Sequence, residues 1–200
     1  MQENSIRRSN RERTQATRTA LIAAARKLFV EKGFADTGTP EIVAKANVTR
    51  GALYHHFADK TDLFRAVVMQ EAQAISTRIR KETGNPASAL NTLVAGAEAY
   101  FAAMAVEGRA RLLLVDGPAI LGHIDMDQVD KETGGEELHQ GLMIAVSQGM
   151  LNDAPLDALT ALLSAAFDRA ALAISQGGPE EDYKAAIRLI ITGLLGCKPQ

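Results

Sequence analysis

The segment of residues 48–60 limits what this chain can fold into more than any other part. It reads VTRGALYHHFADK, and its first hydroxyl residue, Thr49, stands where a helix would begin. Only Val48, Leu53 and Phe57 suit a hydrophobic core. Almost every polar group of the segment suits a phosphate or a base edge, so the segment predicts a helix that is laid in the major groove of DNA.

The residues before this segment predict two further helices. Residues 14–32 place their apolar side chains on one helical face, and Gly33 would end that helix. A shorter helix would follow, with Thr39 as N-cap and Pro40 at its first position. It would end in a left-handed turn at Asn47. With the segment described above, this spacing is typical of a helix-turn-helix.

The charge of the chain is unevenly distributed, although its net value is only −2. Up to Lys60 there are roughly 11 Lys and Arg against 6 Asp and Glu; beyond it there are roughly 11 against 18. A basic first part on an acidic remainder indicates a polyanionic partner for the first part alone. Residues 1–13 show no periodicity and predict a flexible basic arm, which is either a solvated tail or a second contact to DNA.

Each polar residue of the predicted recognition helix has a chemical role that it can fill. The helix start at Thr49 can bind a phosphate oxygen, and Arg50 can pair with guanine O6 and N7. Gly51 keeps the helix slim near the groove. His56 is expected to point inward or sideways, and a zinc site at His55 and His56 is disfavoured because adjacent helical residues diverge. The expected DNA-contacting residues are Thr39, Thr49, Arg50, Gly51, Ala52, Tyr54, His55 and Lys60.

Residues 61–200 predict about six more helices, which makes about nine in an all-α chain. Asn85 and Pro86 would begin the fifth helix, and the Asp-Gly-Pro run at residues 116–118 is the sharpest expected break. The charged residues 125–137 predict a loop or an irregular helix. The last two helices, at 155–176 and 179–195, should form an antiparallel hairpin with more apolar surface than the body can cover. A homodimer interface is the economical explanation.

The run GALYHHF at residues 51–57, with Lys60 behind it and Gly33 and Phe34 before it, resembles the N-terminal domain of the TetR family of transcriptional regulators. The helical layout of the remainder is also similar to that family. The resemblance implies a DNA-binding domain at 14–60 and an effector-binding and dimerisation domain at 61–200.

The resemblance further implies a pocket for a small-molecule effector in the second domain. For each candidate lining residue the alternative is an ordinary core position, and Asp116 and Arg169 would either orient a polar effector or form a structural ion pair. The candidates are Tyr100, Phe101, Met104, His123, Met143 and Phe167.

We therefore expect a sequence-specific regulator on a pseudo-palindromic operator, namely a repressor that a small molecule releases. A TetR-like activator and a non-specific nucleic-acid-binding protein remain alternatives. An enzyme is disfavoured, because the sequence has no nucleophile–base set, metal-ligand spacing or phosphate loop, and no cofactor is expected. The lone Cys197 excludes a disulfide framework. No apolar run reaches the roughly 20 residues of a membrane span and no signal-peptide core is present, so a cytoplasmic protein is expected.

Overall fold

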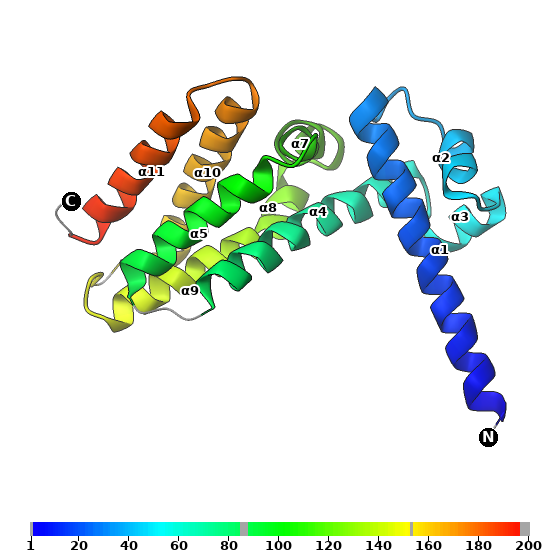
Figure 1. Ribbon diagram of the computed structural model, residues 1–200, viewed down its shortest axis with the longest axis horizontal. Helices are drawn as coiled ribbons and strands as arrows, with labels where there is room; N and C mark the ends of the chain where they lie inside the picture. Colours follow the sequence, from blue (N-terminus) through cyan, green and yellow to red (C-terminus); the bar gives the residue numbers. More distant parts are fainter. Residues whose placement is uncertain (1, 85–87, 153, 197–200) are drawn as a thin grey trace. The chain divides into compact units, whose positions relative to one another are not determined.

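The computed structural model describes residues 2–84, 88–152 and 154–196, and these form eleven α-helices and one π-helical segment without a strand (Figure 1). The expected all-α fold is confirmed. The chain divides into two compact units, Met1–Gln70 and Glu71–Gln200. The division lies ten residues beyond the boundary predicted at residue 60, because the first part of the fourth helix packs into the first unit.

The first unit consists of α1 (Gln2–Lys32), α2 (Thr39–Ala46), α3 (Arg50–His56) and the beginning of α4 (Lys60–Thr83). Each helix contributes apolar side chains to one core, in which the rings of Phe29 and Phe64 meet edge to face with their centres 5.3 Å apart. Phe34 packs against both rings, as expected for a residue behind the end of α1. The fully buried residues are Leu21, Ala25, Phe29, Ile42, Leu53, Leu63, Phe64 and Val68.

Two backbone positions fix the turns between these helices. Gly33 has φ 84° and donates its N–H to the carbonyl of Phe29 at 2.9 Å, which ends α1. Asn47 has φ 54° and ψ 45°, in the left-handed region, and its N–H reaches the carbonyl of Ala44 at 3.2 Å. Both turns confirm the sequence prediction, and the second sets the direction in which α3 leaves α2.

The structure differs from two expectations for the first unit. Residues 2–13 are helical and continuous with α1, although no apolar stripe marks them in the sequence. This segment has neither Pro nor Gly, and extending an existing helix needs no new nucleus. In addition, Thr39 is the first residue of α2 and not its N-cap. That position belongs to Gly38, whose backbone is extended and offers no side-chain cap.

The second unit contains the rest of α4 and a layered bundle in which α9 packs on α5 and α10, while α11 packs on the same two helices (Figure 1). Short helices connect α5 to α9 around a π-helical segment. The elements are α5 (Ala89–Met104), α6 (Arg109–Arg111), η1 (Leu112–Asp116), α7 (Gly117–Leu121), α8 (His123–Lys131), α9 (Gly134–Ser147), α10 (Leu156–Ser175) and α11 (Glu180–Leu194).

The structure differs from the expectation where the second unit was predicted to be irregular. Residues 125–137 lie mostly in α8 and the first turn of α9. The Asp-Gly-Pro run is no break, because Pro118 falls in the first turn of α7, where its missing N–H costs nothing. A Cβ at Gly117 would lie 2.9 Å from Sδ of Met126, so glycine permits the close approach of α8. These short helices raise the number of helices in the described residues above the nine that were predicted.

Helix starts and termini of the second unit follow local chemistry. Ser88 caps α5, and its hydroxyl accepts the N–H of Asn91 at 3.2 Å. The predicted caps Asn85 and Pro86 lie outside the described residues, as does Cys197. The final hairpin is confirmed: α10 and α11 differ from the predicted ranges by one residue at each end, and Gly177, with φ 91°, makes the turn between them.

Candidate functional site

Helix α3 separates an inner from an outer face within only two turns. Leu53 and Phe57 are buried in the first unit, whereas Arg50, Tyr54 and His55 are exposed. The hydroxyl of Thr49 accepts the N–H of Ala52 at 3.1 Å, as predicted for the N-cap. The amphipathic pattern therefore anchors α3 by its apolar side and leaves its polar side available.

Three of the predicted DNA-contacting residues meet on that outer face. The guanidinium carbon of Arg50 lies 5.5 Å from the ring centre of Tyr54, one turn along α3. Hydrogen bonds with the side chains of Arg50 and then Thr39 lower the pKa of the Tyr54 hydroxyl. Thr39 comes from the first turn of α2, so the starts of two helices and their backbone N–H groups lie at one polar surface.

The smaller residues of α3 leave room in front of the helix. A Cβ at Gly51 would find only the Thr49 hydroxyl, at 3.9 Å, so nothing in the described chain requires glycine there. Ala52 is half-buried beside it. His55 is exposed and its ring centre lies 5.3 Å from that of His56, which is more buried and whose pKa burial lowers. His56 therefore takes the sideways position expected for it.

Lys60 has structural partners that the sequence did not indicate. Its ammonium donates to the carbonyl oxygens of Phe34 at 2.8 Å and Thr37 at 3.0 Å, and lies 4.2 Å from the centre of the Phe34 ring. These contacts bind the start of α4 to the turn between α1 and α2. Two of the three ammonium protons are thus engaged, and the predicted phosphate contact would fall to the third.

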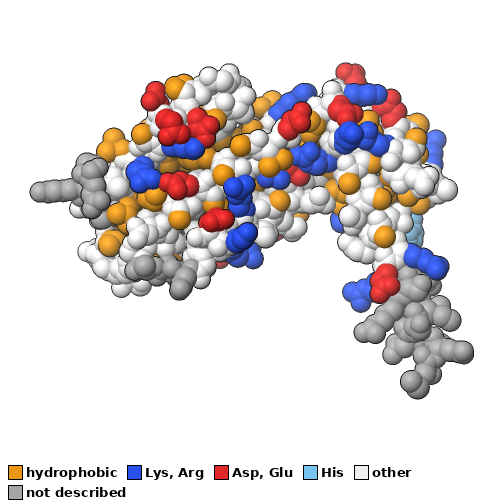
Figure 2. Space-filling model, viewed as in Figure 1, with side chains coloured by type: hydrophobic (Ala, Val, Ile, Leu, Met, Phe, Trp, Pro, Cys, Tyr) orange, Lys and Arg blue, Asp and Glu red, His pale blue; other side chains and the backbone are white. Residues whose placement is uncertain are grey.

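Several acidic residues of the first unit have partners within the unit. Lys32 pairs with Glu41 at 2.8 Å, where α1 meets α2, and Lys and Arg side chains alternate with Asp and Glu there (Figure 2). The carboxylates of Asp59 and Asp62 accept N–H groups at the start of α4.

The sequence did not indicate a role for Arg18. Its guanidinium carbon lies 5.2 Å from the ring centre of Phe57, and its charge adds a cation beside α3.

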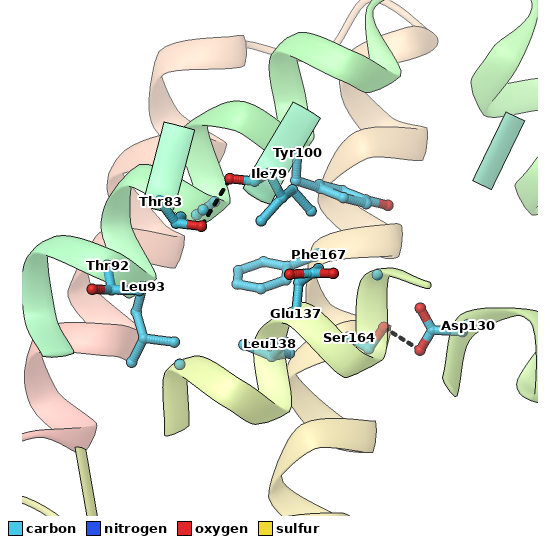
Figure 3. Close-up of a pocket in the computed structure, with 14 residues that line it drawn as sticks. Ile79, Thr83, Thr92, Leu93, Tyr100, Asp130, Glu137, Leu138, Ser164 and Phe167 are labelled. Carbon is cyan, nitrogen blue, oxygen red and sulfur yellow. Dashed lines mark hydrogen bonds between the residues drawn. The ribbon is translucent and has the colours of Figure 1, made fainter. Parts of the chain in front are cut away.

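The second unit encloses a cavity of about 870 Å³ between α4, α5, α7, α8, α9 and α10. Of the predicted effector residues, Tyr100, Met104 and His123 line it. Phe167 lines a smaller adjoining cavity of about 40 Å³, which shares Tyr100 with the larger one (Figure 3). The cavity is of the size that small-molecule sites occupy.

Two of the predicted effector residues lie elsewhere. Phe101 is buried on the side of α5 that faces α11, and Met143 is 46% exposed on α9 and lines none of the three cavities found in the described residues. Asp116 pairs with Arg111, 3.3 Å from its Nε atom, whereas Arg169 is exposed at the large cavity. Helical periodicity identified these residues as apolar or charged but could not say which neighbour each would face.

The polar groups of the cavity form two pairs. The Tyr100 hydroxyl donates to Oδ1 of Asp168 at 2.5 Å. The Ser164 hydroxyl donates to Oδ2 of Asp130 at 2.7 Å, which Figure 3 shows. Burial raises the pKa of Asp168 to about 6; the Tyr100 hydroxyl lowers it and the nearby charge of Asp130 raises it. Burial likewise raises the pKa of Asp130.

Sequence reasoning missed these carboxylates, although one signal was present. Ser164 and Asp168 lie one turn apart in a helix that is otherwise almost wholly apolar, so both fall on one face.

Within the described ranges no group of three or more His, Cys, Asp or Glu side chains is placed to hold a metal ion. Among the described helices, α10 is by itself long and apolar enough to cross a membrane, as the core helix of a soluble protein can be; α5 and the segment Arg109–Leu121 reach that length and composition only together, across a bend of 101°.

Comparison with known proteins gives matches over both units. Residues 21–67 match the family described as bacterial regulatory proteins, tetR family, and residues 90–196 match the tetracyclin repressor-like C-terminal domain. The structure of a TetR-family transcriptional regulator from Pectobacterium atrosepticum is 31% identical, covers 95% of this chain and 99% of that one, and superimposes with a TM-score of 0.75.

Two curated relatives have assigned roles in transcription. The transcriptional repressor BepR of Brucella suis is 41% identical over 63 residues, which are 32% of this chain and 30% of that protein. The transcriptional activator FasR of Mycolicibacterium smegmatis is 26% identical over 155 residues, 70% of each chain. The chain covers only about a third of the length of the first curated relatives.

Proposed function

Because the chain belongs to the TetR family of transcriptional regulators, we propose that it is a homodimeric repressor whose operator binding a small molecule weakens. It is a DNA-binding transcriptional regulator, and its family and fold are those of regulators rather than enzymes. The observation that carries the proposal is the outer surface of α3, where Thr39, Arg50 and Tyr54 meet in front of an open Gly51.

In the proposed complex α3 lies in the major groove with its N-terminal turn toward the bases. Arg50 pairs with a guanine, and stacking on Tyr54 restricts its rotamers before DNA arrives. Thr39, Thr49 and the backbone N–H groups of both helix starts bind phosphates and set the register. Ala52 and His55 contact the neighbouring base or backbone, and Lys60 adds a phosphate contact beside its structural bonds.

The proposed dimer forms through α10 and α11. Leu162 is 71% exposed and Leu189 is 60% exposed, and on the face drawn in Figure 2 hydrophobic side chains reach the surface of the second unit. An isolated monomer would leave these side chains in water, whereas a two-fold interface would cover them. Two copies of α3 then contact half-sites about one helical turn, roughly 34 Å, apart on a pseudo-palindromic operator.

The proposed effector binds in the large cavity of the second unit. A ligand that binds more tightly to the state with misplaced DNA-binding units weakens operator binding by its differential affinity for the two states. An activator is the second candidate, supported by the likeness to FasR over 70% of the chain. A non-specific nucleic-acid-binding protein would show affinity governed by salt alone. We place the regulator in the cytoplasm, where its operator would be.

Transcription in vitro separates these candidates. The template carries a site selected from random DNA, placed across the promoter of one reporter and upstream of a second. A repressor lowers the transcript of the first reporter in proportion to site occupancy and leaves a scrambled-site template unaffected. Raised transcript from the second reporter would establish the activator instead, and equal effects on scrambled DNA would refute sequence-specific regulation.

A further inference from the structure

We propose that the large cavity of the second unit selects an organic cation with an apolar body, held between the carboxylates of Asp168 and Asp130. The inference rests on the proposed function, because it assigns a ligand class to the effector cavity. The two carboxylates come from different helices, Asp168 from α10 and Asp130 from α8, and both line the cavity.

Neither carboxylate has a cationic partner among the described residues. Asp168 accepts the hydroxyl proton of Tyr100, and Asp130 accepts that of Ser164 and a backbone N–H of Gly135. The charged group that acts on Asp168 is another carboxylate, Asp130. A partly buried anion without a counter-ion is unfavourable, and the charges of the two carboxylates also repel each other, so the pair favours the arrival of a positive charge.

The other ionisable groups that line the cavity do not neutralise the negative charge of Asp130 and Asp168. Lys131 and Arg169 are exposed at its edge, and His123 is exposed as well. The other acidic lining residues are exposed too, and His139 lies 3.3 Å from the Thr160 hydroxyl, so the acidic side chains that are partly buried in the cavity wall are Asp130 and Asp168. The acidic lining residues are Asp127, Asp130, Glu136, Asp157 and Asp168.

The walls select a cation with an apolar body rather than a bare ion. Ile75, Met104, Leu113, Met126 and Leu172 line the cavity, and the Tyr100 ring offers an aromatic face beside Asp168. A volume of about 870 Å³ admits a molecule with several rings. A metal cation does not fit, because no described group of side chains provides a metal-ligand set.

Two ions of nearly equal size and shape but opposite charge test the selection directly. Tetraphenylphosphonium and tetraphenylborate, each titrated calorimetrically into the full-length protein in sodium buffer at pH 7.5, differ in little but charge. The proposal predicts that the phosphonium binds at least about tenfold more tightly, because the partly buried carboxylates attract its charge and repel that of the borate. Equal affinities, tighter borate binding or no phosphonium binding would overturn it.

Substitutions locate the charge that selects. Asp168→Asn keeps the acceptor for Tyr100 and should weaken phosphonium binding about tenfold while leaving borate binding unchanged or tighter. Asp182→Asn removes the same charge from an exposed side chain of α11 that does not line the cavity, and it should change neither affinity. Asp130→Asn provides a second variant should the first fold poorly. Unchanged phosphonium affinity in well-folded Asp168→Asn and Asp130→Asn proteins would refute the assignment.

The proposed function is measured separately, as binding to a selected DNA site in the absence of the phosphonium and the borate. An absence of specific DNA binding would contradict the proposed regulator function and would leave the charge preference of the cavity unaffected. Specific DNA binding together with equal affinities for the two ions would contradict only the ligand class. Release of the DNA by the phosphonium and not by the borate would support both.

Discussion

The guanidinium carbon of Arg50 lies 5.5 Å from the ring centre of Tyr54, so the first and fifth residues of α3 act together on its exposed side. Stacking of a guanidinium on an aromatic ring restricts a long side chain that would otherwise lose much rotamer entropy on binding. The arrangement would prepare Arg50 for the proposed bidentate contact to guanine, and the consequences of that contact can be measured.

Replacing Arg50 by Ala should weaken binding to the selected DNA site by about 1–3 kcal/mol, because a bidentate contact to guanine is lost. Binding to scrambled DNA should weaken far less, since only one phosphate-attracting charge disappears. Fluorescence anisotropy at two salt concentrations measures both affinities. Equal losses on the two DNAs would assign Arg50 to the phosphate backbone.

Replacing Gly51 by Ala should separate stability from DNA binding. The added methyl has open space within the chain and improves helix propensity, so unfolding should cost up to about 1 kcal/mol more. The same methyl would stand between α3 and the groove, and we expect weaker operator binding. Urea denaturation and anisotropy measure the two effects; a variant that binds DNA as tightly as the parent would show that Gly51 does not face the groove.

Replacing Lys60 by Met should destabilise the first unit by about 1–3 kcal/mol, because the partly buried carbonyls of Phe34 and Thr37 lose their donor. Lys27→Met removes an exposed lysine of the same unit and should stay within about 0.5 kcal/mol of the parent in urea denaturation. If Lys60 also contacts a phosphate, the slope of the logarithm of DNA affinity against the logarithm of salt concentration should be smaller by about one in Lys60→Met than in the parent. Equal stability of both variants would contradict the structural role.

Asp168 should make stability depend on pH in an identifiable direction. Burial raises its folded pKa to about 6 from the ordinary value of 3.8, so its contribution to stability is complete below pH 4 and lost as the pH rises through 6. The groups facing it are Tyr100 from α5, Ser164 on its own helix and Asp130 from α8, whose raised pKa acts in the same sense. The other titratable groups around the cavity are His123, Asp127, Lys131, Glu136, His139, Asp157 and Arg169.

We therefore expect Asp168→Asn to unfold with a free energy about 2 kcal/mol higher than the parent at pH 7.5, with the difference shrinking toward pH 4. Denaturation of both proteins between pH 4 and 8 measures that difference and cancels the titration of other groups. A difference that grows as the pH falls would mean that the Asp168 carboxylate stabilises the fold.

Replacing Leu162 or Leu189 by Glu should produce a folded monomer, because a charge at the centre of a two-fold apolar interface meets its own copy. Ile124 on α8 is 84% exposed but lies outside α10 and α11, and Ile124→Glu should remain a dimer. Light scattering gives the mass and circular dichroism the helix content. A dimeric Leu162→Glu, Leu189→Glu double variant would refute the proposed interface.

Local signals in the sequence predicted the first unit well. Gly33, Asn47 and the Thr49 cap each impose a backbone conformation or supply an acceptor that does not depend on distant residues. The cap at Thr39 was misplaced because Gly38 caps without a side chain. The partners of Lys60 and Arg18 were not predictable, since both depend on how α1 lies against residues far along the chain.

The residues of the proposed effector cavity were predicted less well, for a reason that is also physical. Apolar periodicity shows that Phe101 and Met104 are buried, yet three residues along a helix are enough to turn one toward α11 and the other toward the cavity. Asp168 is a polar residue in an apolar helix. Its hydrogen-bond partner, Tyr100, lies 68 residues earlier in the chain, so the sequence near Asp168 does not reveal it.

Selection of bound DNA from a random library asks at once whether α3 reads bases and whether two copies of α3 do so together. We predict an enriched inverted repeat whose half-sites lie about one helical turn apart, with guanine at the position that Arg50→Ala no longer selects. A library that returns no enriched sequence, or a single unrepeated half-site, would contradict it.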